Sequence, residues 1–242
     1  MSEKNSQKFN SRVIDINGYC IYVGPCKKCP KSVKPWIKQF CKLPENNWFA
    51  EIDRSWAADQ FNNYGLQDLI PNYELALNLI SDQHSKDWIQ LSDQDVSSIL
   101  VQAKTLYGLL HARWICQTRG LYQMKMKYNS GIFGICPRAC CKNVPLIPMG
   151  TTFKLRRHSV KMFCPCCYDI YSPPHFASNI DGAYFGPSFP HIFLLENQEF
   201  DLHHQFQALP LSIYGFNIHD SVRQRFEPHK NNCQKDEYPE SN

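Results

Sequence analysis

Four cysteines in two short-spaced pairs are the residues of this sequence best suited to specific chemistry. Four residues separate Cys136 from Cys141, two separate Cys164 from Cys167, and 22 lie between the pairs. A structural zinc ion takes four thiolates in a tetrahedron, and each short loop can present two of them without strain. The spacing therefore predicts one structural Zn²⁺ per chain.

Two further cysteines leave the choice of ligands open. Cys140 and Cys166 lie inside the same loops, so other pairings of thiols exist on paper. Pro137 and Pro165 each follow a cysteine of the favoured set and bend the chain into a knuckle, which favours that set. The alternative without a metal is a pair of disulfides or plain buried thiols.

A site with four cysteine ligands indicates a structural rather than a catalytic metal ion. Four protein ligands leave no open position at which zinc could activate water. The sequence has no H-x-E motif, no kinase glycine loop and no HRD or DFG motif, so we expect no enzyme. Zinc modules of this kind bind nucleic acid, another protein or a second copy of themselves.

Charge is unevenly spread along the 242 residues, whose formal net charge is +4. Residues 1–38 hold eight Lys and Arg against two acids, and residues 136–171 hold six against one. A basic zinc module could follow a phosphate backbone. No recognition-helix motif accompanies the charge, so a solvated rim is favoured over a nucleic-acid interface.

The N-terminus and the hydropathy pattern predict an intracellular, soluble protein. Residues 1–12 are polar and charged, unlike a secretory signal, and no apolar run reaches membrane-spanning length. We therefore expect a protein of the cytoplasm and nucleus, without a membrane partner, whose thiols are reduced or bound to metal. A second metal at Cys26 and Cys29, completed by Cys20 or Cys41, is disfavoured because the spacing is irregular.

Apolar residues recur at helical spacing from Trp36 onwards. The pattern predicts a first helix at Trp36, a short helix that carries Ala57, Phe61 and Tyr64, and another that begins near Pro71. The longest predicted helix has the apolar stripe Ile99, Leu100, Ala103, Leu106, Tyr107, Leu110, His111 and Trp114.

Other segments have weaker signals. Residues 1–35 are predicted to be a poorly ordered basic tail, and the polar residues 81–97 a loop. His111 is expected to be a hydrogen-bonded core histidine, since no second histidine or carboxylate shares its turn. Arg113 and Arg119 could anchor loops or an acidic partner.

An aromatic strip near the C-terminus is the second candidate site. Tyr214, Phe216 and Ile218 occupy alternate positions about Gly215, which would place them on one side of a strand or tight hairpin. A polar tail follows, so the strip is expected to be exposed. The alternative is an edge strand packed on its own core.

Several longer motifs, in this order, resemble the regulatory (beta) subunit of casein kinase II. They are WIKQF, WFAEID, LYGLLHARWICQTRG, FGICPRACC with CPCC, DGAYFGPSFPH and IYGFNIH. The resemblance runs from about Trp36 to His219 and implies an α+β fold. It implies a helical domain at 36–131, a zinc-ribbon dimerisation domain at 132–190 and a C-terminal segment at 191–242 that ends in a disordered tail.

The same resemblance implies a non-catalytic subunit that binds, stabilises and steers the catalytic alpha subunits. Its partners would be the alpha subunit, a second copy and the protein substrates of the kinase. The cysteines of the favoured set fall on the family's zinc ligands. The kinase would dock on a hairpin at about 209–219, through Ile213, Tyr214, Phe216 and Ile218.

A zinc ribbon this small has little core of its own. The apolar residues beside the knuckles are therefore expected to pack on a symmetric copy; they are Pro137, Ala139, Val160, Met162 and Ile170.

This chain departs from the family pattern in its basic extension 1–35, which replaces an acidic serine site. Its segment 81–98 is also less acidic than the family's loop. These departures predict a divergent member with altered regulation.

Overall fold

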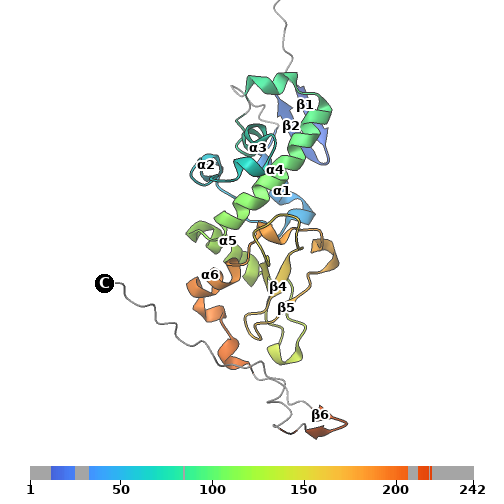
Figure 1. Cartoon of the computed structure of the whole chain (residues 1–242), viewed down its shortest axis with the longest axis vertical. Helices are drawn as coiled ribbons and strands as arrows, with labels where there is room; N and C mark the ends of the chain where they lie inside the picture. The colour runs from blue at the N-terminus through green and yellow to red at the C-terminus, as the bar shows by residue number, and fades with distance from the viewer. Residues whose placement is uncertain (1–11, 25–32, 84, 207–211, 218, 220–242) are drawn as a thin grey trace, which may run out of the picture.

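The computed structural model of the chain describes residues 12–24, 33–83, 85–206, 212–217 and 219. In Figure 1, most of the helices and an N-terminal β-hairpin lie in the upper half of the molecule, and small strands, loops and a C-terminal helix lie in the lower half. The described residues form three small antiparallel sheets alongside the helices, which confirms an α+β fold. No helix among them is long and apolar enough to span a bilayer.

The helices are α1 (Trp36–Lys42), α2 (Arg54–Ala58), α3 (Tyr73–Ile80), α4 (Asp93–Trp114), α5 (Thr118–Asn129) and α6 (Phe189–Glu196). The strands are β1 (Arg12–Ile16), β2 (Tyr19–Val23), β3 (Ile147–Met149), β4 (Lys161–Phe163), β5 (Ile170–Tyr171), β6 (Ser212–Ile213) and β7 (Phe216–Asn217). Short 3₁₀ turns join them: η1 (Pro44–Asn46), η2 (Gln67–Leu69), η3 (Lys86–Gln90), η4 (Ala139–Cys141), η5 (His175–Ala177), η6 (Gly182–Tyr184), η7 (Gln198–Phe200) and η8 (His203–Gln205).

The segment predicted to be a poorly ordered tail contains a β-hairpin, so that prediction is wrong for residues 12–24. β1 and β2 pair antiparallel about Asn17–Gly18, a dipeptide typical of tight hairpin turns. Tyr19 is fully buried and stacks on Trp36, with ring centroids 5.9 Å apart. The Gln39 side chain of α1 also hydrogen-bonds both backbone groups of Cys20. The hairpin thus belongs to the core.

Helix α4 begins earlier than its apolar stripe suggested. Ser92 and Asp95 form a capping box: each side chain bonds the backbone N–H of the other, so the helix starts at Asp93. The prediction of a loop at 81–97 is therefore wrong at its end. It is also wrong at Trp88, which lies in η3 and is fully buried.

Helix α2 is shorter than predicted. It ends at Ala58, and the chain then turns, so Phe61 and Tyr64 do not continue its apolar face. Both side chains are more than four-fifths exposed. The helices predicted at Trp36 and after Pro71 are confirmed as α1 and α3.

Two buried polar side chains of α4 bind the backbone of the segment that leads to α2. His111 Nε2 accepts a hydrogen bond of 2.9 Å from the N–H of Ala50. The Tyr107 hydroxyl donates to the carbonyl of Ala50 at 2.7 Å and accepts from the N–H of Ile52. Because buried backbone groups must be paired, these bonds allow an irregular segment to lie inside the core.

The other side of His111 joins the helices to the cysteine-rich half. Its Nδ1 lies 2.7 Å from the carbonyl oxygen of Tyr184 in η6 and donates to it, since Nε2 is the acceptor. Gly108, one turn earlier, makes room for the Tyr184 ring, which a Cβ at this position would overlap. The prediction of a hydrogen-bonded core histidine is confirmed.

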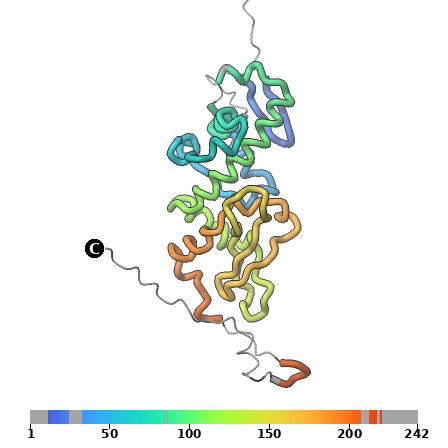
Figure 2. The backbone as a smooth tube through the Cα atoms, in the orientation of Figure 1, coloured from blue at the N-terminus to red at the C-terminus, as the bar shows by residue number. Residues whose placement is uncertain are grey.

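The buried side chains form one continuous core through both halves. The tube in Figure 2 shows α6 beside the small sheet, and Phe193 of α6 packs on Tyr128 of α5 at 5.5 Å. Helix α6 runs across residue 190, where the sequence placed a domain boundary.

We expect His111 to make stability depend on pH. Burial lowers its pKa from 6.5 to about 4, so below pH 6.5 the unfolded chain binds a proton that the folded chain excludes. This contribution to the free energy of unfolding is complete above pH 6.5 and falls with acidification, by about 2.5 kcal/mol at pH 4.5.

Urea unfolding of wild type and of His111→Gln at pH 7.0, 5.5 and 4.5 measures this pH-dependent contribution to the free energy of unfolding. The variant should be less stable at pH 7.0, and the gap should narrow towards pH 4.5. Any acid release of metal affects both proteins and cancels in the difference. A gap that stays constant over this range would contradict the assignment.

Candidate metal centre

The structure brings together the four cysteines that the spacing favoured. One sulfur from each of Cys136, Cys141, Cys164 and Cys167 lies within 4.8 Å of the other three, and all four residues are buried. Across the two loops, the sulfurs of Cys136 and Cys167 are 3.9 Å apart, and so are those of Cys141 and Cys164. Four sulfurs at 2.3 Å from one zinc ion would be about 3.8 Å apart, so the cluster has the size of a tetrahedral zinc site.

The two loops that carry these thiols have the same design. The residue after each pair, Lys142 in one loop and Tyr168 in the other, has a left-handed backbone with φ of +49° and +57°. Backbone hydrogen bonds close both loops, from Cys136 N–H to the Val144 carbonyl and from Cys164 N–H to the Asp169 carbonyl. Each chain reversal turns two side chains towards the same point.

Polar contacts around the cluster suit thiolates. The N–H of Cys166 points at the Cys164 sulfur at 3.4 Å, and the Tyr171 hydroxyl lies 3.2 Å from the Cys167 sulfur. Donors of this kind stabilise the charge on metal-bound sulfur and orient the ligand. Tyr171 was not singled out from the sequence, because only the pairing of β4 with β5 brings it to the cluster.

Burial favours the protonated form of two of these thiols when no metal is bound. It raises the pKa of Cys164 to about 12 and raises that of Cys141 further. Burial also acts on Cys167, but hydrogen bonds from the Tyr171 hydroxyl and the backbone outweigh it and lower the pKa of that thiol. A divalent cation must displace those protons, so binding should weaken on acidification. The donor set, with four soft sulfurs and no water-accessible position, fits zinc held for structure.

The alternatives left open by the sequence are decided by geometry. Cys140 is half-buried, Cys166 is buried, and neither belongs to the four-sulfur group. All nine cysteines that the structure describes are free, and the 3.9 Å separations exceed a disulfide bond. Cys26 and Cys29 lie outside the described residues. Cys41, their possible partner, contacts the Tyr107 hydroxyl at 3.3 Å.

The second candidate site is a hairpin about Gly215, one of the two arrangements predicted for the aromatic strip. β6 and β7 pair Ile213 with Phe216 across the strands. Tyr214 and Gly215 form the turn with φ of +48° and +84°, as in a type I′ turn. Tyr214 therefore lies at the tip, and the expected alternation of Tyr214 with Phe216 on one side of a strand is wrong. Ile218 lies outside the described residues.

The three predicted docking side chains that the structure describes are largely uncovered. Ile213 is 59% exposed, Tyr214 98% and Phe216 79%. A strand packed on its own core would not leave them so.

The residues expected at a dimer contact fall into two groups. Pro137, Ala139 and Ile170 are exposed beside the cluster. Val160 and Met162 are fully buried in the single chain, so they have no surface left for a second copy. Their pattern did not distinguish an internal core from an interface.

Comparison with known proteins adds the family. Residues 35–217 match the family model described as the casein kinase II regulatory subunit. The chain is 40% identical over 191 residues to the casein kinase II subunit beta of Dictyostelium discoideum. The alignment covers 78% of this chain and 70% of that protein. It is 38% identical over 188 residues to the subunit beta' of Drosophila melanogaster, with 77% and 85% covered. The chain therefore belongs to the casein kinase II regulatory subunit family, which is non-catalytic.

Proposed function

We propose that this regulatory subunit acts as a zinc-containing homodimer that carries kinase catalytic subunits on its β6–β7 hairpin. It would stabilise them and modulate their choice of protein substrates in the cytoplasm and nucleus. Residues 36–131 would be the helical domain, 132–190 the zinc-ribbon dimerisation domain and 191–242 the C-terminal segment. The observation that carries the proposal is the exposed hairpin in a chain of this family.

Zinc follows from the donor set. The sheet at the cluster has strands of three, three and two residues, too little to fix two loops by itself. A metal that joins the loops would supply the missing constraint, and binding and folding of the module would be one equilibrium.

We therefore expect Cys164→Ser to lose zinc and to unfold the module around β3–β5. Cys140→Ser and Cys166→Ser are the matched controls and should keep one zinc per chain. Elemental analysis of the purified proteins, with circular dichroism of each, measures both effects. Full zinc occupancy in Cys164→Ser would contradict the ligand set.

A dimer contact at the cluster is supported by its exposed apolar residues. Ile170 is 51% exposed and Ile135 is 52% exposed in the single chain, and Pro137 and Ala139 are exposed near the ligands. In a symmetric contact each of these residues would occur twice in the interface, once on each protomer.

Ile170→Asp should convert the dimer into a zinc-loaded monomer, because the two-fold axis would bury two unpaired carboxylates. Val101→Asp, at an equally exposed position on α4, is the control and should stay dimeric. Light scattering at micromolar concentration reads the mass. A wild-type monomer with zinc bound would contradict the proposal.

The hairpin is built to present its side chains. Gly215 adopts a positive φ that permits a two-residue turn, and the turn puts Tyr214 beyond the Ile213–Phe216 pair. Aromatic anchors of this kind dominate the binding energy of many interfaces when a pocket receives them.

The double variant Tyr214→Ala/Phe216→Ala should weaken binding of the catalytic subunit by about three decades, at about 2 kcal/mol for each ring. Its zinc content and thermal unfolding should be unchanged, since the rings contribute little to the core. Tyr122→Ala/Phe153→Ala removes the same two ring types at exposed positions elsewhere and should bind normally. Calorimetry against the catalytic subunit gives the affinity, and wild-type affinity in the hairpin variant would refute the docking assignment.

A further inference from the structure

A groove with an aromatic floor and an acidic rim lies between α2 and the start of α5. Its volume is about 540 Å³, and Trp56 and Trp114 line it with their rings 5.1 Å apart at 65°. Asp53 and Asp59 stand on the rim, and Arg119 reaches across one side to Asp53 at 3.5 Å. Neither the cysteine cluster nor the β6–β7 hairpin contributes a residue to it.

The loop from Asp59 to Gly65 borders this groove and is held by side chains as well as by its own turns. The Arg113 guanidinium donates to the carbonyls of Asn62 and Tyr64 at 2.7 and 2.8 Å. The fully buried Asn63 amide donates to the carbonyls of Ala57 and Asp59, both at 2.7 Å. The Asp59 carboxylate accepts from the N–H of Phe61.

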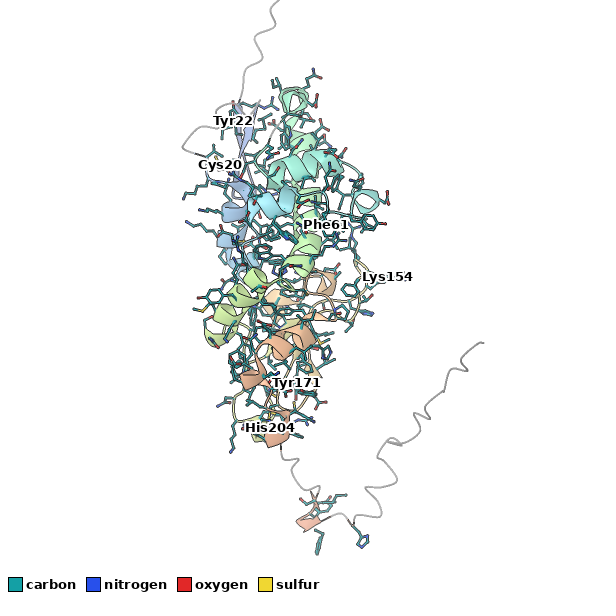
Figure 3. The ribbon with its side chains drawn as sticks, turned by 90° about the vertical axis from the view of Figure 1, so that its left-hand side faces the viewer. Cys20, Tyr22, Phe61, Lys154, Tyr171 and His204 are labelled. Atoms are coloured by element: carbon teal, nitrogen blue, oxygen red, sulfur yellow. The ribbon has the colours of Figure 1, made fainter. Side chains whose placement is uncertain are left out.

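This well-anchored loop displays two aromatic side chains to solvent. Phe61 is 86% exposed and Tyr64 is 84% exposed. Figure 3 shows the molecule from the left-hand side of Figure 1, the side on which α2 lies, and Phe61 is labelled there. Rings at these positions add nothing to the core, but an ordered loop offers them to a partner at little entropic cost.

The charge around the groove defines that partner. Two acids, Asp53 and Asp59, line the groove against one base, Arg119. Arg119 pairs with Asp53, so the Asp59 carboxylate carries the negative charge that no base of the lining neutralises. A basic segment is therefore attracted and an acidic one repelled.

We propose that this groove and its aromatic loop dock a basic, apolar-flanked peptide segment of a partner protein. An arginine of the segment stacks on the Trp56 ring and pairs with Asp59, while its apolar neighbours cover Phe61 and Tyr64. Asp53 already accepts from Ser55, so Asp59 is the rim carboxylate with most capacity for a new cation. Arg119 opposes the incoming charge. The inference does not rest on the proposed function.

Fluorescence anisotropy with the full, zinc-loaded chain tests the proposal. The probe is a fluorescein-labelled peptide Arg-Leu-Arg-Arg-Leu-Arg-Leu, and its matched control carries citrulline, the neutral isostere, at every arginine. The arginine peptide should bind and the citrulline peptide should not. The affinity of the arginine peptide should fall as the salt concentration rises from 50 to 200 mM, because the attraction is electrostatic.

Four variants separate this groove from general acidity. Asp59→Asn keeps the bond to the Phe61 N–H but removes the charge, and should weaken binding about fivefold. Phe61→Ala should weaken it about 30-fold, as for an interface anchor. Arg119→Gln should tighten binding about threefold, because it removes a like charge. Glu196→Gln on α6 removes an exposed acid elsewhere and should change nothing.

Three results would overturn the proposal. One is equal binding of the citrulline peptide, and another is unchanged affinity in Asp59→Asn and Phe61→Ala. The third is an equal loss in Glu196→Gln, which would mean attraction to the overall charge. Circular dichroism and zinc content confirm that each variant is folded.

Discussion

The two halves of this molecule depend on one buried histidine that must satisfy both of its ring nitrogens. His111 accepts from Ala50 on one side and donates to Tyr184 on the other. A neutral imidazole has one donor and one acceptor, so each bond requires the other and the ring has one tautomer. Removing either partner would leave a polar atom unpaired in the core, which is costly. The helices and the cysteine-rich half are thus positioned by hydrogen bonds as well as by shape.

The packing around His111 follows from this bond. Gly108 lets the Tyr184 ring lie against α4, and Phe49 and Phe185 flank the imidazole at 4.9 and 5.1 Å. These contacts hold η6 on α4, and the loops that precede η6 in the chain carry the four clustered thiols. The helices and the cysteine-rich half thus form one packed body.

Exposed aromatic groups occur in two separate segments of the described chain. The hairpin displays Tyr214 and Phe216, and the loop after α2 displays Phe61 and Tyr64. The hairpin carries its rings on a two-residue turn, whereas the α2 loop is tied down by Arg113 and Asn63. We infer one surface for the catalytic subunit and another for a basic partner, so that both could bind at once.

The sequence by itself determined the features that depend on short spacing. The two cysteine pairs predicted the four-sulfur cluster, and the apolar periodicity predicted α1, α3 and most of α4. Spacing suffices there because the loop or helix is local and has its own geometry. The hairpin at 12–24 was also readable in principle, from Asn17–Gly18 between apolar runs, although the basic charge around it pointed to a tail.

Only the tertiary structure decided which apolar and polar residues face inwards. Val160 and Met162 are apolar residues beside the knuckles that were expected at an interface, yet they are buried in the core of the single chain. Phe61 and Tyr64 have the spacing of an apolar helix face, yet their side chains are exposed to solvent. Tyr214 has a left-handed backbone and lies in a turn, so it does not alternate with Phe216 along a strand as the sequence had suggested. The partners of His111 come from segments 61 and 73 residues away, and the hydroxyl of Tyr171 reaches Cys167 through strand pairing. Burial and long-range hydrogen bonds are properties of the whole packed chain, and no local pattern of residues contains them.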